Sequence, residues 1–514
     1  MPTLVSSSIG AAWLIEHFSL KVVNPLTTLS RIGSRRHTLS NESLRTETYQ
    51  EAMRPAPTLR AHLLFHLKHE DTHLELLSRL FACANPDEIS AWIASEPSSQ
   101  YARRTGFLYE WFTGTQLVGV STAGNYVDVL DASQMVVATV AKPNQRWRVR
   151  DNMPGTPAFC PTIRLTPQTL LSMALDCTQR LEALEREFGE NLLMKSAVWL
   201  TLRESKASFQ IEGEADKKDR IKRFADVLHE YTGQGEVPLN EAALAHLQKA
   251  ILGEVTAIEH FGVRQSPVFV GQTVRYEETI HYVAPPCEDL PAMLNGLTAF
   301  LIETAGQSAV MRSAVASFGF VYIHPLADGN GRVHRLLIND ILRRDGTVPA
   351  PYIIPVSGLI AKSSAERMRY DRILDIFSAP LMKQIGAACA FQAKFTRYPD
   401  GISSNFVFSG DDDARHAWRY IDFTQHVQFL ADVIDRTITQ DMYEESRYLK
   451  SYLLAKAAIK DLVEMPDLQV DRVIRSVEAN HSLLSGVLAK EIPVLKTEGL
   501  WADIVKAVKQ AFIL

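Results

Sequence analysis

The spacing of apolar residues divides the chain into a mixed first part and a strongly helical remainder. Residues 58–81 (TLRAHLLFHLKHEDTHLELLSRLF) have helical spacing, whereas residues 124–141 (GNYVDVLDASQMVVATVA) alternate or cluster β-branched side chains. We therefore expect a mixed α/β domain over residues 1–165. It should contain a helix in the first of these segments and strands around a turn in the second.

The pattern becomes helical from Thr166, where Pro167 stands near the first turn of the segment 166–188. Residues 266–286 (SPVFVGQTVRYEETIHYVAPP) interrupt the helices, and their β-branched residues before a prolyl pair predict a short β-hairpin. Helices then resume to about residue 395. A polar segment, residues 396–416, begins a last helical region that reaches residue 514. The fold class is thus mainly α, with domains at 1–165, 166–395 and 396–514.

Composition narrows the possibilities without identifying a function. A chain of 514 residues is too long for one hydrophobic core, and 46% hydrophobic with 22% charged residues is typical of globular proteins. The net charge of −5 indicates no general affinity for nucleic acid or an anionic membrane. Five scattered cysteines without CxxC spacing, no basic region at the N-terminus and no apolar stretch of bilayer length predict a soluble, cytoplasmic protein.

Twelve residues, His324–Arg335 (HPLADGNGRVHR), combine two imidazoles, a carboxylate, a Gly-Asn-Gly run and two arginines. Apolar residues on both sides predict a loop whose second half begins a new helix. The residues with this spacing are Val310, Ala314, Val315, Phe318 and Val321 before the loop, and Val333, Leu336, Leu337, Asp340 and Ile341 after it.

The second half of this loop is suited to bind phosphate. A helix N-terminus offers unpaired N–H groups and the positive end of the helix dipole. Gly329 and Gly331 allow close approach of an anion to the backbone. We expect the side-chain amide of Asn330 to donate to a phosphate oxygen. Arg332 and Arg335 are three apart, so one helix face directs both toward phosphates.

The first half of the loop supplies the remaining groups. Asp328 offers a carboxylate where a cation bridging phosphates would need an oxygen ligand. His324 can accept a proton near neutral pH. His334 points away from the arginine face, and we assign it no chemical role. The twelve residues therefore predict a nucleotide phosphate site with a general base.

This stretch resembles the signature of the Fic family, HxFx(D/E)GNGRxxR. The positions that match are His324, Asp328, Gly329, Asn330, Gly331, Arg332 and Arg335. The one departure is Leu326, where the family usually has a phenylalanine that packs into the core. The resemblance covers roughly residues 166–395 and does not extend to the flanking regions.

The resemblance implies that the chain binds ATP and moves its AMP part to a Ser, Thr or Tyr hydroxyl of a target protein, with self-modification also expected. His324 would deprotonate the hydroxyl, and Asp328 would hold Mg²⁺ or Mn²⁺. The Gly329–Gly331 amides would bind the phosphates, and Arg332 and Arg335 would contact the outer ones. The related Doc branch, which phosphorylates, typically has Lys in place of Gly331, so the glycine favours nucleotidyl transfer.

A second stretch, SFQIEGE (Ser208–Glu214), resembles the inhibitory motif (S/T)xxxE(G/N) of the family. Ser208 and Glu212 are four apart and share a helix face, and Gly213 can end that helix. In the family, this glutamate pairs with the second motif arginine, here Arg335, and prevents the γ-phosphate from binding productively. We expect the same self-inhibition here; the alternative is a surface glutamate at the end of a helix.

The hairpin in residues 266–286 occupies the place of the family's flap, which aligns the target by strand addition. An exposed hairpin edge can bind an extended peptide through main-chain hydrogen bonds. We expect Val274, Ile280 and Tyr282 to belong to this flap. The alternative is a hairpin that only covers the core.

Other clusters suggest different chemistry. HEDTH, His69–His73, matches the pattern HExxH, and together with His62 and His66 it raises the alternative of a zinc site. Asp71 inside the pattern and the lack of a distant third ligand count against zinc. Arg103–Arg104, Arg343–Arg344 and the arginines around Trp147 are more typical of solvated faces than of a nucleic-acid site.

We therefore expect a self-inhibited protein adenylyltransferase. Glu212 could also activate water to remove AMP, which leaves a deAMPylase or a bifunctional enzyme open. A further hypothesis is that residues 1–165 bind a partner or nucleic acid while the helical core only senses nucleotide. The sequence identifies neither the target nor the nucleotide base, and a homo-oligomer is compatible with it.

Overall fold

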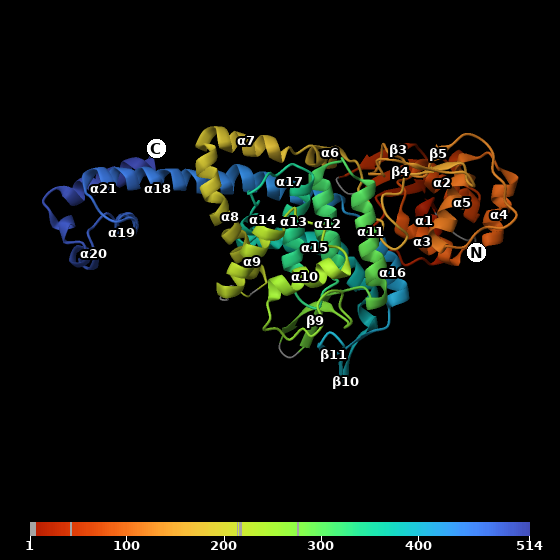
Figure 1. Ribbon diagram of the computed structural model, residues 1–514. Coiled ribbons are helices and arrows are strands. Elements are labelled where there is room, and N and C mark those ends of the chain that lie inside the picture. Colours follow the sequence, from red (N-terminus) through yellow and green to blue (C-terminus); the bar gives the residue numbers. More distant parts are fainter. Residues whose placement is uncertain (1–6, 42–43, 213, 215–217, 275–276, 514) are drawn as a thin grey trace.

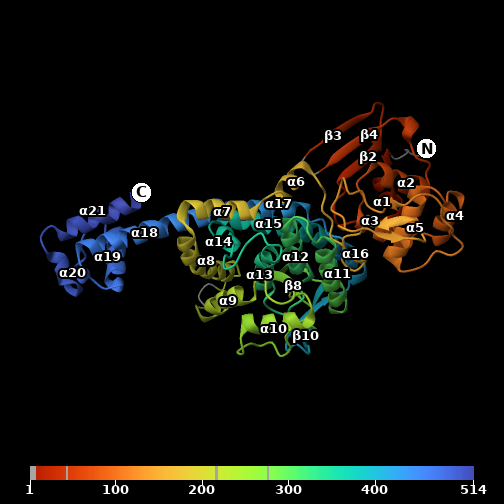
Figure 2. The ribbon, with the colours of Figure 1, turned by 45° about the horizontal axis from the view of Figure 1, so that its top comes forward.

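The computed structural model describes residues 7–41, 44–212, 214, 218–274 and 277–513. The molecule is elongated, with an N-terminal domain at one end, a helical core in the middle and a helical arm at the other end (Figure 1, Figure 2). Helices predominate, and the strands of the described residues form four small sheets. The prediction of a mainly α fold is confirmed.

In its described residues, the N-terminal domain contains five α-helices, a short 3-10 helix (Glu51–Met53) and two small sheets. The first sheet has the strand order β1-β2-β4-β3, in which only β2 and β4 are parallel, and the second has the order β5-β7-β6. The elements are β1 (Ser8–Ile9), α1 (Ala11–Phe18), β2 (Thr28–Ile32), β3 (His37–Ser40), β4 (Arg45–Tyr49), α2 (Leu59–His69), α3 (Leu74–Cys83), α4 (Pro86–Ser95), α5 (Gln100–Thr113), β5 (Val127–Asp128), β6 (Lys142–Asn144) and β7 (Val149–Asp151).

Two predictions for this domain are wrong in detail. The single helix expected over residues 58–81 is two helices, because the His73 side chain accepts a hydrogen bond from the Leu76 N–H and so caps a new helix, α3. The strands expected over residues 124–141 are reduced to β5. The following backbone bonds to a side chain instead of a strand, since the Asn152 amide accepts from the Leu130 N–H and donates to the Leu130 carbonyl.

The core is built around α12 (Ala309–Ile323) and α13 (Asn330–Arg344), which are buried along almost their whole length. The surrounding helices contribute their apolar faces to the same hydrophobic cluster. They are α6 (Pro167–Met173), α7 (Cys177–Phe188), α8 (Glu190–Ile211), α9 (Lys218–Tyr231), α10 (Glu241–Leu252), α11 (Leu290–Glu303), α14 (Val356–Ile360), α15 (Ser364–Ile385), α16 (Asp411–Arg419) and α17 (Thr424–Arg436).

Two β-hairpins lie at one side of this core. The first consists of β8 (Phe269–Val274) and β9 (Glu277–Val283), as predicted. The second consists of β10 (Cys389–Arg397) and β11 (Ser403–Phe408), where the sequence pattern had indicated helix and then a polar linker. The hairpins meet through aromatic rings: Phe269 lies 5.4 Å from Phe391 and 4.8 Å from Phe406 between ring centroids.

The core continues past the predicted boundary at residue 395, because α16 and α17 bury apolar residues in the main cluster as far as Met442. A π-helical turn, Thr437–Met442, then leads into the arm. The arm has its own hydrophobic cluster and consists of α18 (Tyr443–Leu462), α19 (Asp467–Ala479), α20 (Gly486–Glu491) and α21 (Leu500–Ile513). Within the described ranges, no helix combines the length and apolar character needed to cross a membrane.

Candidate active site

The loop between α12 and α13 has little freedom to move. α12 ends at Ile323, and His324 then adopts a left-handed backbone conformation with φ 50°. Gly329 adopts another, with φ 96°, directly before α13. A positive φ is unfavourable for a residue with a side chain, so the conformation of His324 is held by its surroundings. The predicted sequence of helix, loop and new helix is confirmed.

Polar side chains fix the loop from inside. The Asn330 amide donates to the Leu326 carbonyl at 2.7 Å and accepts from the Leu326 N–H at 3.0 Å. The Gln248 amide of α10 donates to the Asp328 carbonyl at 2.9 Å and accepts from the Gly262 N–H. Both ends of the Asn330 amide thus hold the loop together, and its expected donation to a phosphate, through the second N–H of the amide, stays a prediction.

The two glycines of the loop are needed for different reasons. A Cβ atom on Gly329 would meet nothing within 4 Å, so its positive φ alone favours glycine there. A Cβ atom on Gly331 would lie 2.2 Å from Oε1 of Glu212. Gly331 is thus the point where the backbone of α13 and the Glu212 carboxylate come close together.

His324 is half-buried, and one of its ring nitrogens contacts the backbone of α12. Its Nδ1 lies 3.1 Å from the Val321 carbonyl oxygen, which assigns the proton to Nδ1 and leaves Nε2 as an acceptor. Burial, and then the charge of Arg264, lower the pKa of His324 to about 4. Arg264 also donates to the His324 carbonyl at 2.8 Å. The imidazole is therefore neutral at physiological pH.

Glu212 binds both arginines of the motif. Its Oε1 accepts from Nη1 of Arg335 at 2.7 Å, and its Oε2 lies 3.2 Å from Nε of Arg332. Ser208 accepts from the same nitrogen of Arg335 at 3.1 Å, so both residues of the expected helix face reach this arginine. Asp328 accepts from Nη2 of Arg332 at 3.0 Å. Burial would lower the pKa of Arg335, but the charge and hydrogen bond of Glu212, together with smaller contributions from Tyr370 and Glu204, outweigh burial and raise the pKa.

Glu212 directly follows α8, and Gly213, expected to end this helix, lies outside the described residues. α8 is held by two charged side chains that lie about one turn before Ser208. The Glu204 carboxylate accepts from the Ser357 N–H at 2.7 Å and from its hydroxyl, and burial raises the pKa of Glu204 to about 7. Arg203 donates at 2.8 Å to the buried Asp441, which lies in the π-helical turn and also accepts from Lys362.

A cavity of about 440 Å³ lies between the end of α12, the first hairpin and α15; Val321 and Tyr322, which shortly precede His324, line it. Its wall combines aromatic rings, aliphatic side chains and two carboxylates. The lining residues are Val270, Gln272, His281, Tyr282, Val321, Tyr322, Arg367, Tyr370, Asp371, Leu374, Asp375 and Ser378. Arg367 also donates to the carbonyl of Ile211 at 2.6 Å, which joins this wall to the end of α8.

The residues expected in the flap differ in their surroundings. Tyr282 is buried, and its hydroxyl donates to the Tyr322 carbonyl, so it anchors β9 to the core and presents no docking surface. Ile280 is half-buried against the core. Val274 ends β8 in a pair with Glu277, and its side chain lies outside the described residues. Among the side chains of this hairpin that the structure describes, Val270 of β8 is a large apolar one that is exposed.

The histidines of the N-terminal domain hold that domain together. Nδ1 of His62 accepts from the Gly10 N–H at 3.1 Å, and Nδ1 of His66 lies 3.0 Å from the buried Glu70 carboxylate. His73 uses one ring nitrogen to cap α3 and the other to contact the Asn24 carbonyl. No group of three potential ligands arranged for a metal ion occurs among the described residues.

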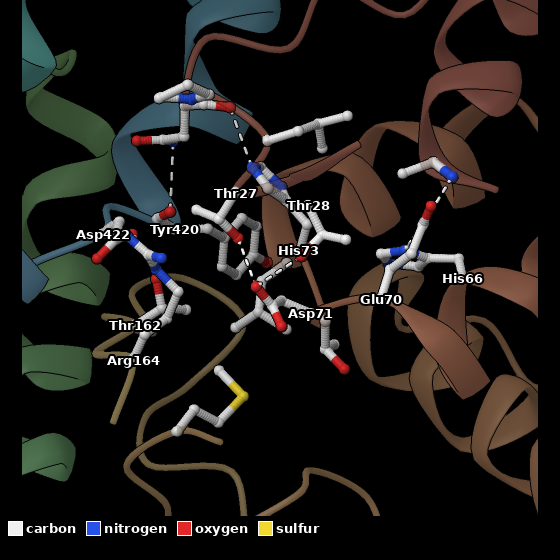
Figure 3. A pocket seen from close by; sticks show the side chains of 17 residues that line it. Thr27, Thr28, His66, Glu70, Asp71, His73, Thr162, Arg164, Tyr420 and Asp422 are labelled. Atoms are coloured by element: carbon white, nitrogen blue, oxygen red, sulfur yellow. Dashed lines mark hydrogen bonds and ion pairs between the residues drawn. The ribbon is translucent and has the colours of Figure 1, made fainter. Parts of the chain in front are cut away.

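Figure 3 shows a small pocket at the junction of the N-terminal domain and the core. Its volume of about 30 Å³ is about that of one water molecule. Asp71 accepts hydrogen bonds from the hydroxyls of Thr27 and Thr28, and Arg164 pairs with Asp422 across the junction (Figure 3). Asp71, the residue that counts against a zinc motif, therefore holds the start of β2.

The remaining candidates for nucleic-acid contact also have structural partners. Trp147 is fully buried, and its indole N–H donates to Glu110 at 2.8 Å. Arg103 is buried and donates to two backbone carbonyls. Trp147 has no face free to stack on a base.

Sequence reasoning missed the residues that support the loop and α8. Gln248 and Glu204 are polar, yet they lie on the apolar faces of α10 and α8. Such an interruption of an apolar face is the one signal that could have singled them out. Arg264 and Asp441 give no comparable signal, because their partners are distant in the chain.

Comparison with known proteins also points to the region that contains the loop after α12. The model of the Fic/DOC family matches residues 238–342. Protein adenylyltransferase fic-1 of Caenorhabditis elegans is 31% identical over 113 residues, 22% of this chain and 20% of that protein. Protein adenylyltransferase Fic of Drosophila grimshawi is 34% identical over 114 residues, 22% of this chain and 21% of that protein. The chain thus spans about a fifth of the length of these curated relatives.

A crystal structure of a Fic family protein from Desulfovibrio desulfuricans G20 aligns with 62% of this chain and 88% of its own, at 17% identity and a TM-score of 0.38. The matched residues 238–342 include the whole loop from His324 to Arg335. They form a domain of the Fic/DOC family.

Proposed function

We propose that this chain is a protein adenylyltransferase that transfers AMP from ATP to a Ser, Thr or Tyr hydroxyl of a target protein. The family of residues 238–342 and the names of the relatives support this reaction class. The hydroxyl oxygen attacks the α-phosphorus, the bond to the bridging oxygen breaks, and pyrophosphate leaves. The oxygen joins the target to AMP as a phosphodiester.

The hydroxyl proton goes to Nε2 of His324. The contact of Nδ1 with the Val321 carbonyl supports this role, because it leaves Nε2 as the free acceptor. The lowered pKa of His324 keeps the ring neutral, and hence able to accept, throughout the physiological range. The support from Gln248 and Asn330 fixes the loop so that the acceptor keeps its place.

The phosphates would lie against the first turn of α13. There the N–H groups lack helical acceptors, and Arg332 and Arg335 can neutralise charge that develops on the leaving pyrophosphate. Asp328 fits as a holder of Mg²⁺ or Mn²⁺, because its carboxylate is about half exposed (51%) and such ions are typically held by one or two carboxylates with phosphate oxygens. When bound, the ion neutralises phosphate charge.

The cavity of about 440 Å³ at the end of α12 is a suitable place for the nucleoside. Its aromatic and aliphatic wall can pack against a base, and Asp371 and Asp375 can accept hydrogen bonds from sugar or base groups. β8 of the first hairpin borders the same cavity through Val270 and Gln272. A target segment added to this hairpin would therefore bring its hydroxyl close to the nucleotide.

We also propose that the enzyme is self-inhibited by Glu212. The contact of its carboxylate with both Arg332 and Arg335 is the single observation that carries this proposal. Two guanidinium groups that are paired with a carboxylate are not free to bind the outer phosphates of ATP. ATP must displace Glu212 before it can bind productively.

The test is transfer of radiolabel from [α-³²P]ATP to protein. Replacement of Glu212 by glycine should increase the initial rate about 10- to 100-fold, the range expected for loss of a regulatory contact. Adding His324→Ala to this variant should remove the label. Label from [γ-³²P]ATP should not appear on protein.

Glu190→Ala is the matched control, since Glu190 is an exposed glutamate of the same helix without a motif contact. Its rate should equal that of the unaltered chain. If Glu212→Gly were no faster than Glu190→Ala, self-inhibition would be wrong, although the enzyme could still be an adenylyltransferase.

Removal of AMP is a second candidate activity. The Glu212 side chain is partly open to solvent (22% exposed) at the same place where the phosphates would bind, so it could activate a water molecule. A target labelled by the Glu212→Gly variant should then lose AMP when the unaltered chain is added. Loss that does not depend on Glu212 would contradict this second role.

A further inference from the structure

A second groove lies on the other side of the first hairpin, between its base and the second hairpin. Its volume is about 330 Å³. One wall is formed by the segments next to β8 and β9, and the other by β11 and the turn before it. The lining residues are Arg264, Gln265, Pro267, Val268, Val283, Ala284, Pro285, Pro286, Cys287, Glu288, Tyr398, Phe406, Val407, Phe408 and Asp411.

One wall of this groove includes a strand that has an unpaired edge. β11 pairs only with β10 in a two-stranded sheet, so its other edge has no strand partner among the described residues. The opposite wall cannot fill that role fully, because Pro267, Pro285 and Pro286 lack N–H donors. An unpaired edge in an aromatic- and proline-lined groove is suited to an extended peptide.

Two acidic side chains line the groove. Glu288 and Asp411 line it, and neither forms an ion pair with a lysine or arginine in the part of the chain that the structure describes. The nearby Arg415 pairs with Asp289 and Asp412 instead. Burial, and then the charge of Glu288, raise the pKa of Asp411, so the two carboxylates repel each other. A positive group between them would relieve this repulsion.

We propose that this groove binds an extended segment of the target protein that carries lysine or arginine. The positive side chains would lie between Glu288 and Asp411 and against the rings of Tyr398 and Phe408, where cations bind favourably. This inference rests on the proposed function and adds to it a preference for basic targets. The first hairpin would align the segment through its backbone, and this groove would select it by charge.

The groove is rigidly joined to the active site. The Asp400 carboxylate, in the turn of the second hairpin, accepts from the N–H and the hydroxyl of Ser266 at 2.9 and 2.7 Å. Arg264, on the floor of the groove, donates to the carbonyls of Pro285 and His324. A segment held in the groove is therefore held at a fixed position relative to His324.

The test measures peptide binding without ATP, so its result does not depend on catalysis. A fluorescent peptide of alternating arginine and threonine is compared with one in which glutamate replaces each arginine. Anisotropy with the full chain should give about tenfold tighter binding of the arginine peptide, and added salt should reduce this preference. The double variant Glu288→Gln, Asp411→Asn should lose most of it.

Asp412→Asn is the matched control, because Asp412 belongs to the same acidic run, is fully exposed and does not line the groove. It should bind the arginine peptide as the unaltered chain does. Equal binding of the two peptides, or equal effects of Asp412→Asn and the double variant, would overturn the proposal. Absence of AMP transfer in a separate assay would contradict the proposed function and leave this binding result unchanged.

Discussion

Two histidine-rich stretches of this chain resemble known motifs, and they differ in how their polar atoms are used. In the N-terminal domain, His73 engages both ring nitrogens within the fold, and the Glu70 carboxylate accepts from the Ala11 N–H as well as contacting His66. In the loop after α12, His324 engages Nδ1 and keeps Nε2 as an acceptor. A group whose bonding capacity is used within the fold holds structure, whereas a group with an unused acceptor near a cavity can do chemistry.

Depressed pKa values do not separate the two stretches. Burial lowers the pKa of His62 to about 4, as it does for His324. It lowers the pKa of His426, in the core, to about 4 as well. Burial thus marks histidines that stay neutral, and only their hydrogen-bond partners tell which of them can accept a proton from a substrate.

The largest expected effect is on the rate. In the Glu212→Gly background, His324→Ala should reduce AMP transfer about 10²- to 10⁴-fold, because it removes the proton acceptor. His66→Ala should leave the rate per folded molecule within about twofold of that background, since His66 lies far from the loop in sequence and contacts Glu70 of its own domain. Initial rates normalised to folded protein compare the two. Equal losses would contradict the distinction.

The next effect is on stability. Replacement of Glu70 by alanine leaves the Ala11 N–H without its acceptor and His66 without its partner, both in a buried region. It should lower the free energy of unfolding of the N-terminal domain by about 3 kcal/mol. Chemical denaturation followed by tryptophan fluorescence measures this. Glu51→Ala, an exposed residue of the same domain, should change it by less than about 0.5 kcal/mol.

A smaller effect concerns how the free energy of unfolding depends on pH. An unfolded chain protonates His426 near its ordinary pKa of 6.5, whereas the folded chain does so only near pH 4. The stability that this neutral ring contributes is complete above pH 6.5 and is lost as the pH falls toward 4. At pH 5.5 the loss should be about 1.4 kcal/mol. His426→Gln keeps a partner for the Tyr322 hydroxyl but cannot take up a proton. The pH dependence of its unfolding between 6.5 and 5 should therefore be shallower, and an unchanged slope would refute this assignment.

The smallest expected effect is an absence of change. If His324 accepts the proton with a pKa near 4, kcat/KM should vary by less than about twofold between pH 8 and 6. A base with the ordinary pKa of 6.5 would lose about three quarters of its neutral form at pH 6. A clear fall in kcat/KM centred near pH 6.5, with saturating metal ion, would show that the base is not His324 in this environment.

The sequence predicted the helices, loop and hairpin that form the site, but not the distant residues that hold them in place. The loop after α12, the helix that carries Ser208 and Glu212, and the first hairpin lie where apolar spacing and turn residues indicated them, because these signals are local. The second hairpin and the extension of the core to Met442 were missed, because β10 is exposed along most of its length and has no alternation. The sequence did not show that the amide of Asn330 also bonds to the backbone of Leu326, because that contact depends on how the loop folds.

The buried Asp441 has a practical consequence for anyone who shortens this chain. It is the acceptor for Arg203 of α8 and for Lys362, and it lies in the last turn before the arm. A truncation designed to remove only the arm would, if it ended a few residues too early, leave Arg203 in α8 and Lys362 after α14 without this acceptor. In protein made in that way, α8 would be held less firmly and with it the position of Glu212. Its rate of AMP transfer should therefore not be taken as that of the intact chain.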